Sequence, residues 1–388
     1  MRRIRVLHLI SSFAVEGPLG GVARYVLGLG RAFDHSQIEL SVAGLWNYHT
    51  GYEEAHCARL NEEGIQAVIT ADWDEAEPYR SCMQAVHGLR QAHLGPVDII
   101  HSHGEFSDLA ALLLARRLGA KATVRTVHNE IEWSKRPLYG KIFPNILYPF
   151  TFTRDLAISR RVEANLNRRI LAQLLGRQAQ IFYNGIDFGR FRAMEKQNNI
   201  REEFGIAPDA RIIGTIGRLT RQKGYDIFLQ AIPALLTQRP DVVALIIGDG
   251  HLREALEEQA KTLGISHVVR FAGPRKDIEQ LLACMDVFVS SSRWEGLPTV
   301  LLESVAARLP IVATAVSGSV ELVQHEGNGL LVPPEDPSAL SHAIDRILSD
   351  LATYQTGTVA ARQAAEEKFS LAAIARQIQH LYANLVAG

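Results

Sequence analysis

Short apolar runs alternate with amphipathic stretches along almost the whole chain, and this alternation constrains the fold more than any other feature. A short run without polar interruption is typical of a strand that is buried on both faces of a parallel sheet. The amphipathic stretches suit helices that connect one parallel strand to the next. Because 388 residues are too many for one ordinary core, we predict an α/β fold with two doubly wound, Rossmann-like domains.

Thirteen segments have the apolar pattern of strands. Those in the first half of the chain are Ile4–Ile10, Ile38–Ala43, Ile65–Ile69, Val97–His101, Ala122–Val127, Asp155–Ile158 and Ala179–Tyr183. Those in the second half are Ile212–Ile216, Val242–Gly248, Val268–Phe271, Val287–Val289, Pro310–Ala313 and Leu330–Val332. We expect one domain over residues 1–190 and another over residues 191–369, connected by the polar segment Phe191–Pro208. The apolar stripe of residues 370–388 predicts a helix that docks on the second domain or returns to the first.

Charge and cysteine content narrow the class of protein. The formal net charge is −1, yet 13 Lys and Arg stand against four Asp and Glu between Arg116 and Arg177. Cys57, Cys82 and Cys284 are too scattered for a disulfide framework or a zinc site, which favours a reducing compartment. The uninterrupted apolar runs are far shorter than a membrane span. We therefore expect a cytoplasmic protein.

Two glutamates flank a loop that leads from a strand into a helix, in the sequence EGLPTVLLE from Glu295 to Glu303. Gly296 allows the backbone to approach a ligand closely, and Pro298 is tolerated where a helix begins. The free N–H groups of that helix start suit a phosphate, and the carboxylates can accept hydrogen bonds from sugar hydroxyls. Two glutamates with no supporting motif would also be explained if Glu295 were a charged loop residue and Glu303 an exposed helix residue. The other motifs favour the functional interpretation.

Three further motifs follow predicted strands, at the edge of the sheet where α/β proteins bind ligands. Gly20 and Gly21 allow a tight turn before a helix, although neither a Walker loop nor a dinucleotide fingerprint is present. His128, in TVHN, falls where a strand runs into a loop, whereas a lone histidine is more often structural. His101 and His103 are similarly placed, but no acidic or cysteine partner has the spacing of a metal site.

The third motif is the basic loop IGRLTRQKGYD, which begins at Ile216 and contains Gly217. Arg218 offers a planar fork to phosphate oxygens and Lys223 a point charge. Each charge-assisted contact is worth about 1.5–3 kcal/mol. The alternative is a basic turn that only meets solvent.

Together these motifs and YNGID (Tyr183–Asp187) resemble the retaining GT-B glycosyltransferases of glycosyltransferase family four, also called glycosyl transferases group 1. The resemblance covers nearly the full chain and is specific for the superfamily rather than for the substrate. It implies a GT-B fold whose two domains face a cleft. The first domain would bind the acceptor and the second the nucleotide sugar.

The resemblance also implies roles for single residues. Arg218 and Lys223 would hold the donor diphosphate, Glu303 the ribose hydroxyls, and Glu295 would lie by the transferred sugar. His128 would contact the far side of that sugar. Further donor contacts are expected from Gly20, Gly21, Gly217, Gly248, Gly250, Gly296, Leu297, Pro298 and Thr299.

The activity implied is transfer of a hexose or N-acetylhexosamine from a nucleotide diphosphate sugar to a glycan, lipid-linked or small-molecule acceptor. Cell-surface polysaccharide or lipopolysaccharide synthesis is the expected setting. No metal or other cofactor is expected, because Arg and Lys neutralise the leaving diphosphate. Retention by front-face attack is implied, since no carboxylate is clearly placed as a nucleophile. The nucleotide base, whether of a UDP-, GDP- or ADP-sugar, and the acceptor are not specified by these motifs.

The basic segment 134–169 interleaves Lys and Arg with aromatic residues. This pattern suits an anionic membrane surface, on the inner face of the plasma membrane, and equally a solvated helix face over a core. A nucleic-acid partner is not expected. Two other functions remain open, a nucleotide-sugar epimerase and a non-catalytic nucleotide-sugar binder. A dehydrogenase lacks its glycine fingerprint.

Overall fold

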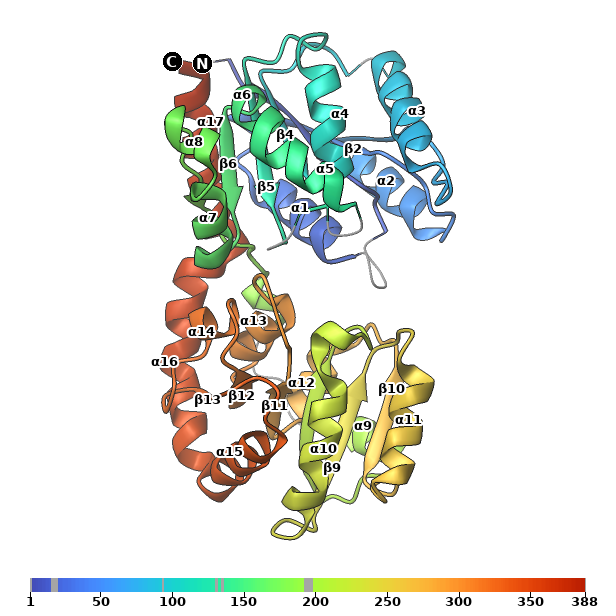
Figure 1. Cartoon of the computed structure of the whole chain (residues 1–388), viewed down its shortest axis with the longest axis vertical. Helices are drawn as coiled ribbons and strands as arrows, with labels where there is room; N and C mark the ends of the chain where they lie inside the picture. The colour runs from blue at the N-terminus through green and yellow to red at the C-terminus, as the bar shows by residue number, and fades with distance from the viewer. Residues whose placement is uncertain are drawn as a thin grey trace. The chain divides into compact units, whose positions relative to one another are not determined.

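The computed structural model describes residues 2–14, 20–92, 94–129, 132–133, 136–191 and 198–387. The chain divides into two compact units, each described here by itself. The N-terminal unit extends to Gly185 and includes the chain from Leu371 onward, and the C-terminal unit is Ile186–Ser370. Each unit contains one sheet, and helices lie along its strands (Figure 1). The predicted α/β class with two parallel sheets is confirmed.

The N-terminal sheet has seven parallel strands in the order β3-β2-β1-β4-β5-β6-β7. Its strands are β1 (Ile4–Ile10), β2 (Ile38–Gly44), β3 (Gln66–Ile69), β4 (Ile99–His103), β5 (Ala122–Val127), β6 (Arg154–Ala157) and β7 (Gln180–Ile181). The strand order reverses between β1 and β4, which makes the carboxyl ends of these two strands a topological switch point.

Helices cover both faces of this sheet because alternate strand residues point to opposite faces. Leu7, Leu9 and Ile100 pack with apolar residues of α3 and α4 on one face. His8 and His101 face the other side, where α1 and α17 pack together. The helices are α1 (Gly20–Ala32), α2 (Tyr52–Glu62), α3 (Pro78–Gln91), α4 (Glu105–Ala115), α5 (Pro137–Ile142), the π-helical turn η1 (Phe143–Leu147), α6 (Tyr148–Thr151), α7 (Arg160–Asn167), α8 (Ile170–Leu174) and α17 (Leu371–Ala387).

The C-terminal sheet has six parallel strands in the order β10-β9-β8-β11-β12-β13. They are β8 (Arg211–Ile216), β9 (Val242–Ile247), β10 (Val269–Gly273), β11 (Val287–Ser290), β12 (Ile311–Thr314) and β13 (Gly329–Val332). Its helical segments are η2 (Phe188–Phe191), α9 (Asn198–Glu203), η3 (Arg221–Lys223), α10 (Tyr225–Leu236), α11 (Arg253–Thr262), α12 (Ile278–Cys284), α13 (Thr299–Ala306), α14 (Ser319–Leu322), α15 (Pro337–Ser349) and α16 (Leu351–Phe369). Here the order reverses between β8 and β11.

Three details differ from the sequence predictions. β4 continues through His103, so His101 and His103 lie inside a buried strand and not beyond its end. Gly20 and Gly21 begin α1 rather than forming the turn before it. The polar segment expected only to connect the domains contains α9. Residues 15–19, which complete the predicted glycine loop, lie outside the described part of the chain.

Candidate active site

The loop after β8 carries two predicted catalytic cations, Arg218 and Lys223. Gly217 opens the loop with φ 155°, and its N–H donates to the carbonyl of Ile247 over 2.9 Å. A Cβ at Gly217 would lie 3.1 Å from the Tyr225 hydroxyl, and the positive φ is one that residues with a Cβ rarely adopt, so glycine fits here. The Arg218 side chain is exposed and makes no hydrogen bond or ion pair with another described residue. Its guanidinium is therefore available to an anionic ligand.

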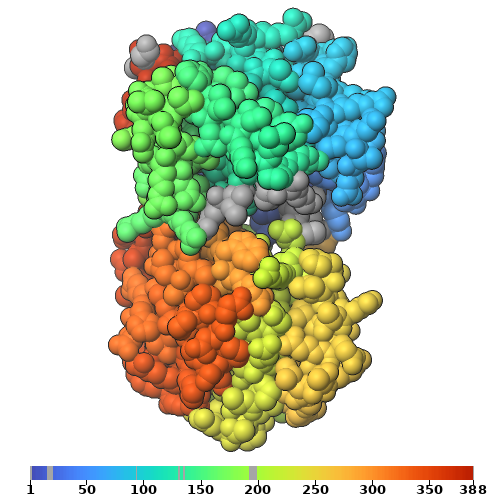
Figure 2. Space-filling model, in the orientation of Figure 1, coloured from blue at the N-terminus to red at the C-terminus, as the bar shows by residue number. Residues whose placement is uncertain are grey.

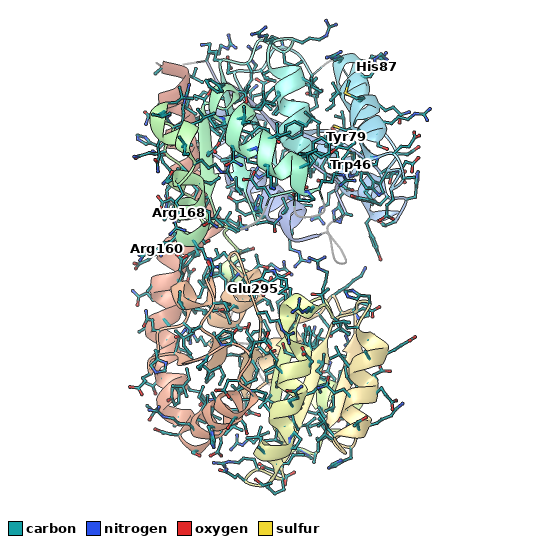
Figure 3. The ribbon with its side chains drawn as sticks, in the orientation of Figure 1. Trp46, Tyr79, His87, Arg160, Arg168 and Glu295 are labelled. Atoms are coloured by element: carbon teal, nitrogen blue, oxygen red, sulfur yellow. The ribbon has the colours of Figure 1, made fainter. Side chains whose placement is uncertain are left out.

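Lys223 forms an ion pair with Glu295, which is labelled in Figure 3. The lysine ammonium donates to Glu295 Oε1 over 2.6 Å, and the same oxygen accepts from Ser292 Oγ over 2.7 Å. The side chain of Glu295 is 6% exposed and that of Lys223 20%. The carboxylate thus holds the ammonium in one place at the edge of the solvent. The structure brings together two predicted site residues that are 72 positions apart in the chain.

The loops after β8 and β11 are fastened to each other by Arg293. Its guanidinium donates to both carboxylate oxygens of Asp226 over 2.8 and 2.7 Å, and to the carbonyl of Arg221 over 2.9 Å. The backbone N–H of Arg293 donates to the carbonyl of Gln222 over 2.8 Å. The hydrogen bonds from Arg293 hold the pKa of Asp226 below its ordinary value. These loops follow the two strands at the topological switch point, which is the usual ligand edge of an α/β sheet.

The turn before α13 presents free backbone donors. Pro298 is the N-cap residue, with φ −73° and ψ 108°. Within the described part of the chain, the N–H groups of Gly296, Leu297 and Thr299 donate to no carbonyl or side chain. Such donors at the start of a helix suit an anion. Glu303, one turn into α13, is 8% exposed, so it is not the solvent-facing helix residue that the alternative interpretation required.

The glycines of the predicted donor site differ in what the fold requires of them. A Cβ at Gly248 would lie 2.0 Å from the carbonyl oxygen of Gly217, and one at Gly250 would lie 2.6 Å from that of Leu219. Backbone packing therefore explains Gly248 and Gly250 without a ligand. A Cβ at Gly21 would meet no other atom within 4 Å, so the space beside this glycine is open.

His128, in the N-terminal unit, follows β5 directly and belongs to a chain of hydrogen-bonded side chains. Its Nε2 lies 3.2 Å from His103 Nδ1, and His103 Nε2 lies 3.0 Å from His8 Nδ1. His8 Nε2 lies 3.0 Å from the hydroxyl of Tyr382, which is 2.5 Å from His101 Nδ1. His8, His101, His103 and Tyr382 are fully buried, whereas His128 is half-buried. The chain thus leads from α17 through the core to the end of β5.

Thr126 and Asn184 stand at the two ends of this series of hydrogen-bonded side chains. His101 Nε2 lies 2.7 Å from Thr126 Oγ1, and Asn184 Nδ2 lies 3.4 Å from His128 Nδ1. Burial lowers the pKa of His128 to about 4, and the imidazole is therefore neutral near pH 7. His8, Asn184 and Tyr382 were not predicted from the sequence. The alternation of His8 with Leu7 and Leu9 on a strand could have suggested only that it faces the opposite side.

Ring nitrogens of His8, His101 and His103 all lie within 4.8 Å of one another, a spacing compatible with metal binding. Each of these nitrogens, however, already faces a histidine, tyrosine or threonine partner at hydrogen-bond distance. A cation would have to displace several of these bonds. The cluster is therefore better described as a hydrogen-bonded chain than as a metal site.

Comparison with known proteins identifies the family. Residues 19–190 match the model of Glycosyltransferase Family 4, and residues 196–364 match that of Glycosyl transferases group 1. An uncharacterized glycosyltransferase of Methanocaldococcus jannaschii is 33% identical over 53% of this chain and 54% of its own length. This chain therefore spans just over half of that relative. The lipopolysaccharide core biosynthesis glycosyltransferase LpsE of Rhizobium meliloti is 31% identical over 68% of this chain and 78% of its own.

A solved structure with the same architecture is that of HepE from Anabaena in complex with UDP-glucose. It matches with a TM-score of 0.81 and 21% identity, covering 98% of this chain and 100% of the other. At this identity the likeness establishes the GT-B fold alone. Together with the family matches, it shows that the chain belongs to glycosyltransferase family 4.

Proposed function

We propose that the chain is a retaining glycosyltransferase that moves a hexose or N-acetylhexosamine from a nucleotide diphosphate sugar to a glycan or lipid-linked acceptor. The observation that carries the proposal is the arrangement after β8 and β11 at the switch point of the C-terminal sheet. That edge holds a Lys223 paired with Glu295, together with Arg218 and N–H groups before α13 that have no partner among the described residues. LpsE is named for lipopolysaccharide core biosynthesis, and HepE was solved with UDP-glucose, which agree with this substrate class.

The chemistry follows from where charge develops. Breaking the bond between the anomeric carbon and the donor phosphate oxygen leaves negative charge on the diphosphate. Arg218, Lys223 and the helix start would stabilise that charge, so no metal is required. The acceptor oxygen forms the new bond from the same face of the sugar, and its proton passes to the departing phosphate oxygen. Glu303 would bind the ribose hydroxyls, and His128 a hydroxyl of the sugar.

The direct test is a donor screen in excess EDTA. The purified chain is incubated with UDP-, GDP- and ADP-hexoses, with and without lipid-linked and glycan acceptors, and products are separated by mass and by anomeric configuration. We expect at least one donor to be used at full rate, with its anomeric configuration retained in the product. A strict need for added metal would contradict the Arg and Lys mechanism. An isomerised donor without any transfer product would identify an epimerase instead.

We infer that the protein binds its acceptor at an anionic membrane surface. The segment expected to bind it is green in the space-filling view (Figure 2). Leu138, Ile142, Ile146 and Phe150 are spaced by four residues along α5, η1 and α6, and each is 40–66% exposed. Side chains at this spacing share one side of a helix. They form a row of large apolar groups that no described residue covers.

Helix α8 adds to this row, which the sequence interpretation did not foresee. α8 contacts η1, and its Ile170 and Leu174 are 73% and 75% exposed. Two of the interleaved aromatic residues, Tyr148 and Phe152, are buried and pack into the core beneath η1, as the alternative of a helix face over a core requires. The exposed face is therefore mainly aliphatic, with Phe150 at one end.

Positive charge lies on α5 itself and on α7, which contacts α8. Lys141 is exposed on α5, and Arg160 and Arg168, labelled in Figure 3, lie at the two ends of α7. Near a membrane each cation contributes about 1 kcal/mol to the attraction of anionic lipid. Lys135 lies outside the described residues. None of the described helices is both long and apolar enough to cross a membrane, so association through this face would be peripheral.

Sedimentation with vesicles tests the membrane surface. We expect binding to phosphatidylglycerol vesicles at low salt, weaker binding at high salt, and little binding to phosphatidylcholine. Changing Ile142→Asp together with Ile146→Asp should reduce partitioning by roughly tenfold or more, because two large apolar side chains no longer enter the lipid. Met83→Asp is the matched control, since Met83 is equally exposed (51%) on α3. Equal loss in both proteins, or no binding at low salt, would refute the assignment.

A further inference from the structure

The chain of side chains from Tyr382 to His128 has a property that follows from counting donors and acceptors. A neutral imidazole has one N–H and one lone-pair nitrogen, and a phenol donates once. If His128 carries its proton on Nε2, it donates to His103 Nδ1, which forces the proton of His103 onto Nε2. His103 Nε2–H then donates to His8 Nδ1, so the proton of His8 lies on Nε2. His8 Nε2–H in turn donates to the hydroxyl of Tyr382. Tyr382 in turn donates to His101.

The proton positions of the four histidines are therefore linked. His128, His103 and His8 carry the proton either all on Nε2 or all on Nδ1, because any mixture leaves two donors or two acceptors facing each other. His101 follows them through Tyr382, because two N–H groups on the hydroxyl oxygen would leave the hydroxyl proton without an acceptor, and two lone pairs would share that one proton. In the buried interior one such mismatch costs about 1–3 kcal/mol. With the Asn184 amide donating to His128 Nδ1, the arrangement with protons on Nε2 is the consistent one.

Burial keeps the chain neutral over the physiological range. It lowers the pKa of His8 to about 3 and that of His128 to about 4, and it lowers the pKa of His101 and His103 well below the ordinary value. The groups facing the chain from α1 and α17 are Tyr25 and Tyr382, whose pKa values burial raises. Neither tyrosine is charged near pH 7. The hydrogen-bonded histidines and tyrosines thus keep one overall charge state, neutral, near pH 7.

Asn184 supplies a second observation at the half-buried end of the chain. Its side chain is 94% buried, since 6% is exposed, yet its Oδ1 has no hydrogen-bond partner among the described residues. An unpaired buried carbonyl is costly unless a ligand or water satisfies it. The lone pair of His128 Nδ1 already accepts from the Asn184 Nδ2 amide. Asn184 Oδ1 is therefore the acceptor that remains for a hydroxyl group of a sugar.

We propose that Tyr382 on the C-terminal helix is a positioning residue for the sugar site, fixing through His8, His103 and His128 the orientation of the Asn184 amide, whose Oδ1 accepts from a substrate hydroxyl. The proposal rests on the proposed sugar site beside His128. It gives α17 a role in the site of the N-terminal unit, although this helix is contributed by the last residues described.

The test uses ¹⁵N-histidine-labelled protein, in which NMR distinguishes protonated from unprotonated ring nitrogens. In the unaltered chain we expect His8, His101, His103 and His128 to share one tautomer and not to titrate between pH 5 and 8. Mixed tautomers would overturn the proposal without any variant. In Tyr382→Phe we expect the His128 signals to become an average of two tautomers. Turnover should fall by roughly two- to tenfold, as the competent form loses population, with donor KM unchanged.

Tyr148→Phe is the matched control, because Tyr148 is equally buried in the same unit and its hydroxyl has no hydrogen-bond partner among the described residues. We expect it to leave the His128 tautomer and turnover as they are. An unchanged His128 tautomer in Tyr382→Phe would overturn the positioning role even if activity fell. A shared tautomer in a chain that transfers no sugar would instead count against the proposed function, which keeps the two failures apart.

Discussion

Lys223→Ala is expected to reduce turnover by about 10²–10³-fold, the scale for removing one preorganised group that stabilises developing charge. The structure adds a reason for so large an effect. Glu295 and Ser292 fix the ammonium before any ligand arrives, so no reorganisation is needed during the reaction. Loss of Lys223 would also leave the buried Glu295 without its cation. The measurement is single-turnover transfer with the donor identified by the screen.

Two comparisons separate this effect from a general loss of basic charge. Arg218→Ala should cost a similar factor, because its exposed guanidinium is the other cation of the same loop. Arg221→Ala should change turnover little, although Arg221 is an exposed cation only two residues from Lys223. Normal transfer by the Lys223 and Arg218 variants, or equal losses at all three positions, would show that the proposed roles are wrong.

Arg125→Met is expected to lower the free energy of unfolding of the N-terminal unit by about 3–5 kcal/mol, the typical cost of removing one partner from a buried ion pair. Arg125 is completely buried on β5 and donates to both oxygens of Asp155 over 2.9 and 2.8 Å. It also donates to Glu132 over 2.5 Å, and Glu132 bonds Arg169 in turn. The substitution would leave these carboxylates facing a low-dielectric interior. Denaturant unfolding measures the loss.

The pH dependence distinguishes this mechanism from simple loss of packing. Burial raises the pKa of Asp108, another neighbour of Arg125, to about 7, and removal of the cation would raise it further. A carboxyl whose pKa is raised in the folded state binds more protons folded than unfolded, so its contribution to stability improves as pH falls toward the unfolded value. The Arg125→Met defect should therefore be smaller at pH 5 than at pH 8. A defect independent of pH would contradict the ion-pair explanation, and Arg80→Ala, at an exposed pair, should show none.

Much of the fold follows from the sequence because apolar runs mark strands that are buried on both faces. All thirteen predicted strands are present, and every boundary agrees within two residues. The predicted end of β4, at His101, was wrong because His101 and His103 resemble loop residues when only their sequence neighbours are considered. Their partners are His8 and Tyr382, the second of them 281 positions from His101. The sequence around His101 does not indicate that its partner is the Tyr382 hydroxyl on α17.

The candidate site was predictable as a set of residues and not as a set of contacts. Arg218, Lys223 and Glu295 were each recognised from their motifs, but the ion pair that orients Lys223 joins two loops brought together by strand order. Arg293, which fastens those loops, carries no motif of its own. In the basic segment, the sequence left open whether the aromatic residues meet a membrane surface or a core. Packing against the sheet buries Tyr148, and leaves aliphatic residues such as Ile146 exposed.

A crystal structure of the chain with the nucleotide that most stabilises it would test the proposed donor site most directly. The expected result is a pyrophosphate within hydrogen-bond distance of Arg218 and Lys223, with the N–H groups before α13 beside it and the ribose hydroxyls on Glu303. A nucleotide bound elsewhere, with Lys223 still paired only to Glu295, would contradict the proposed donor site.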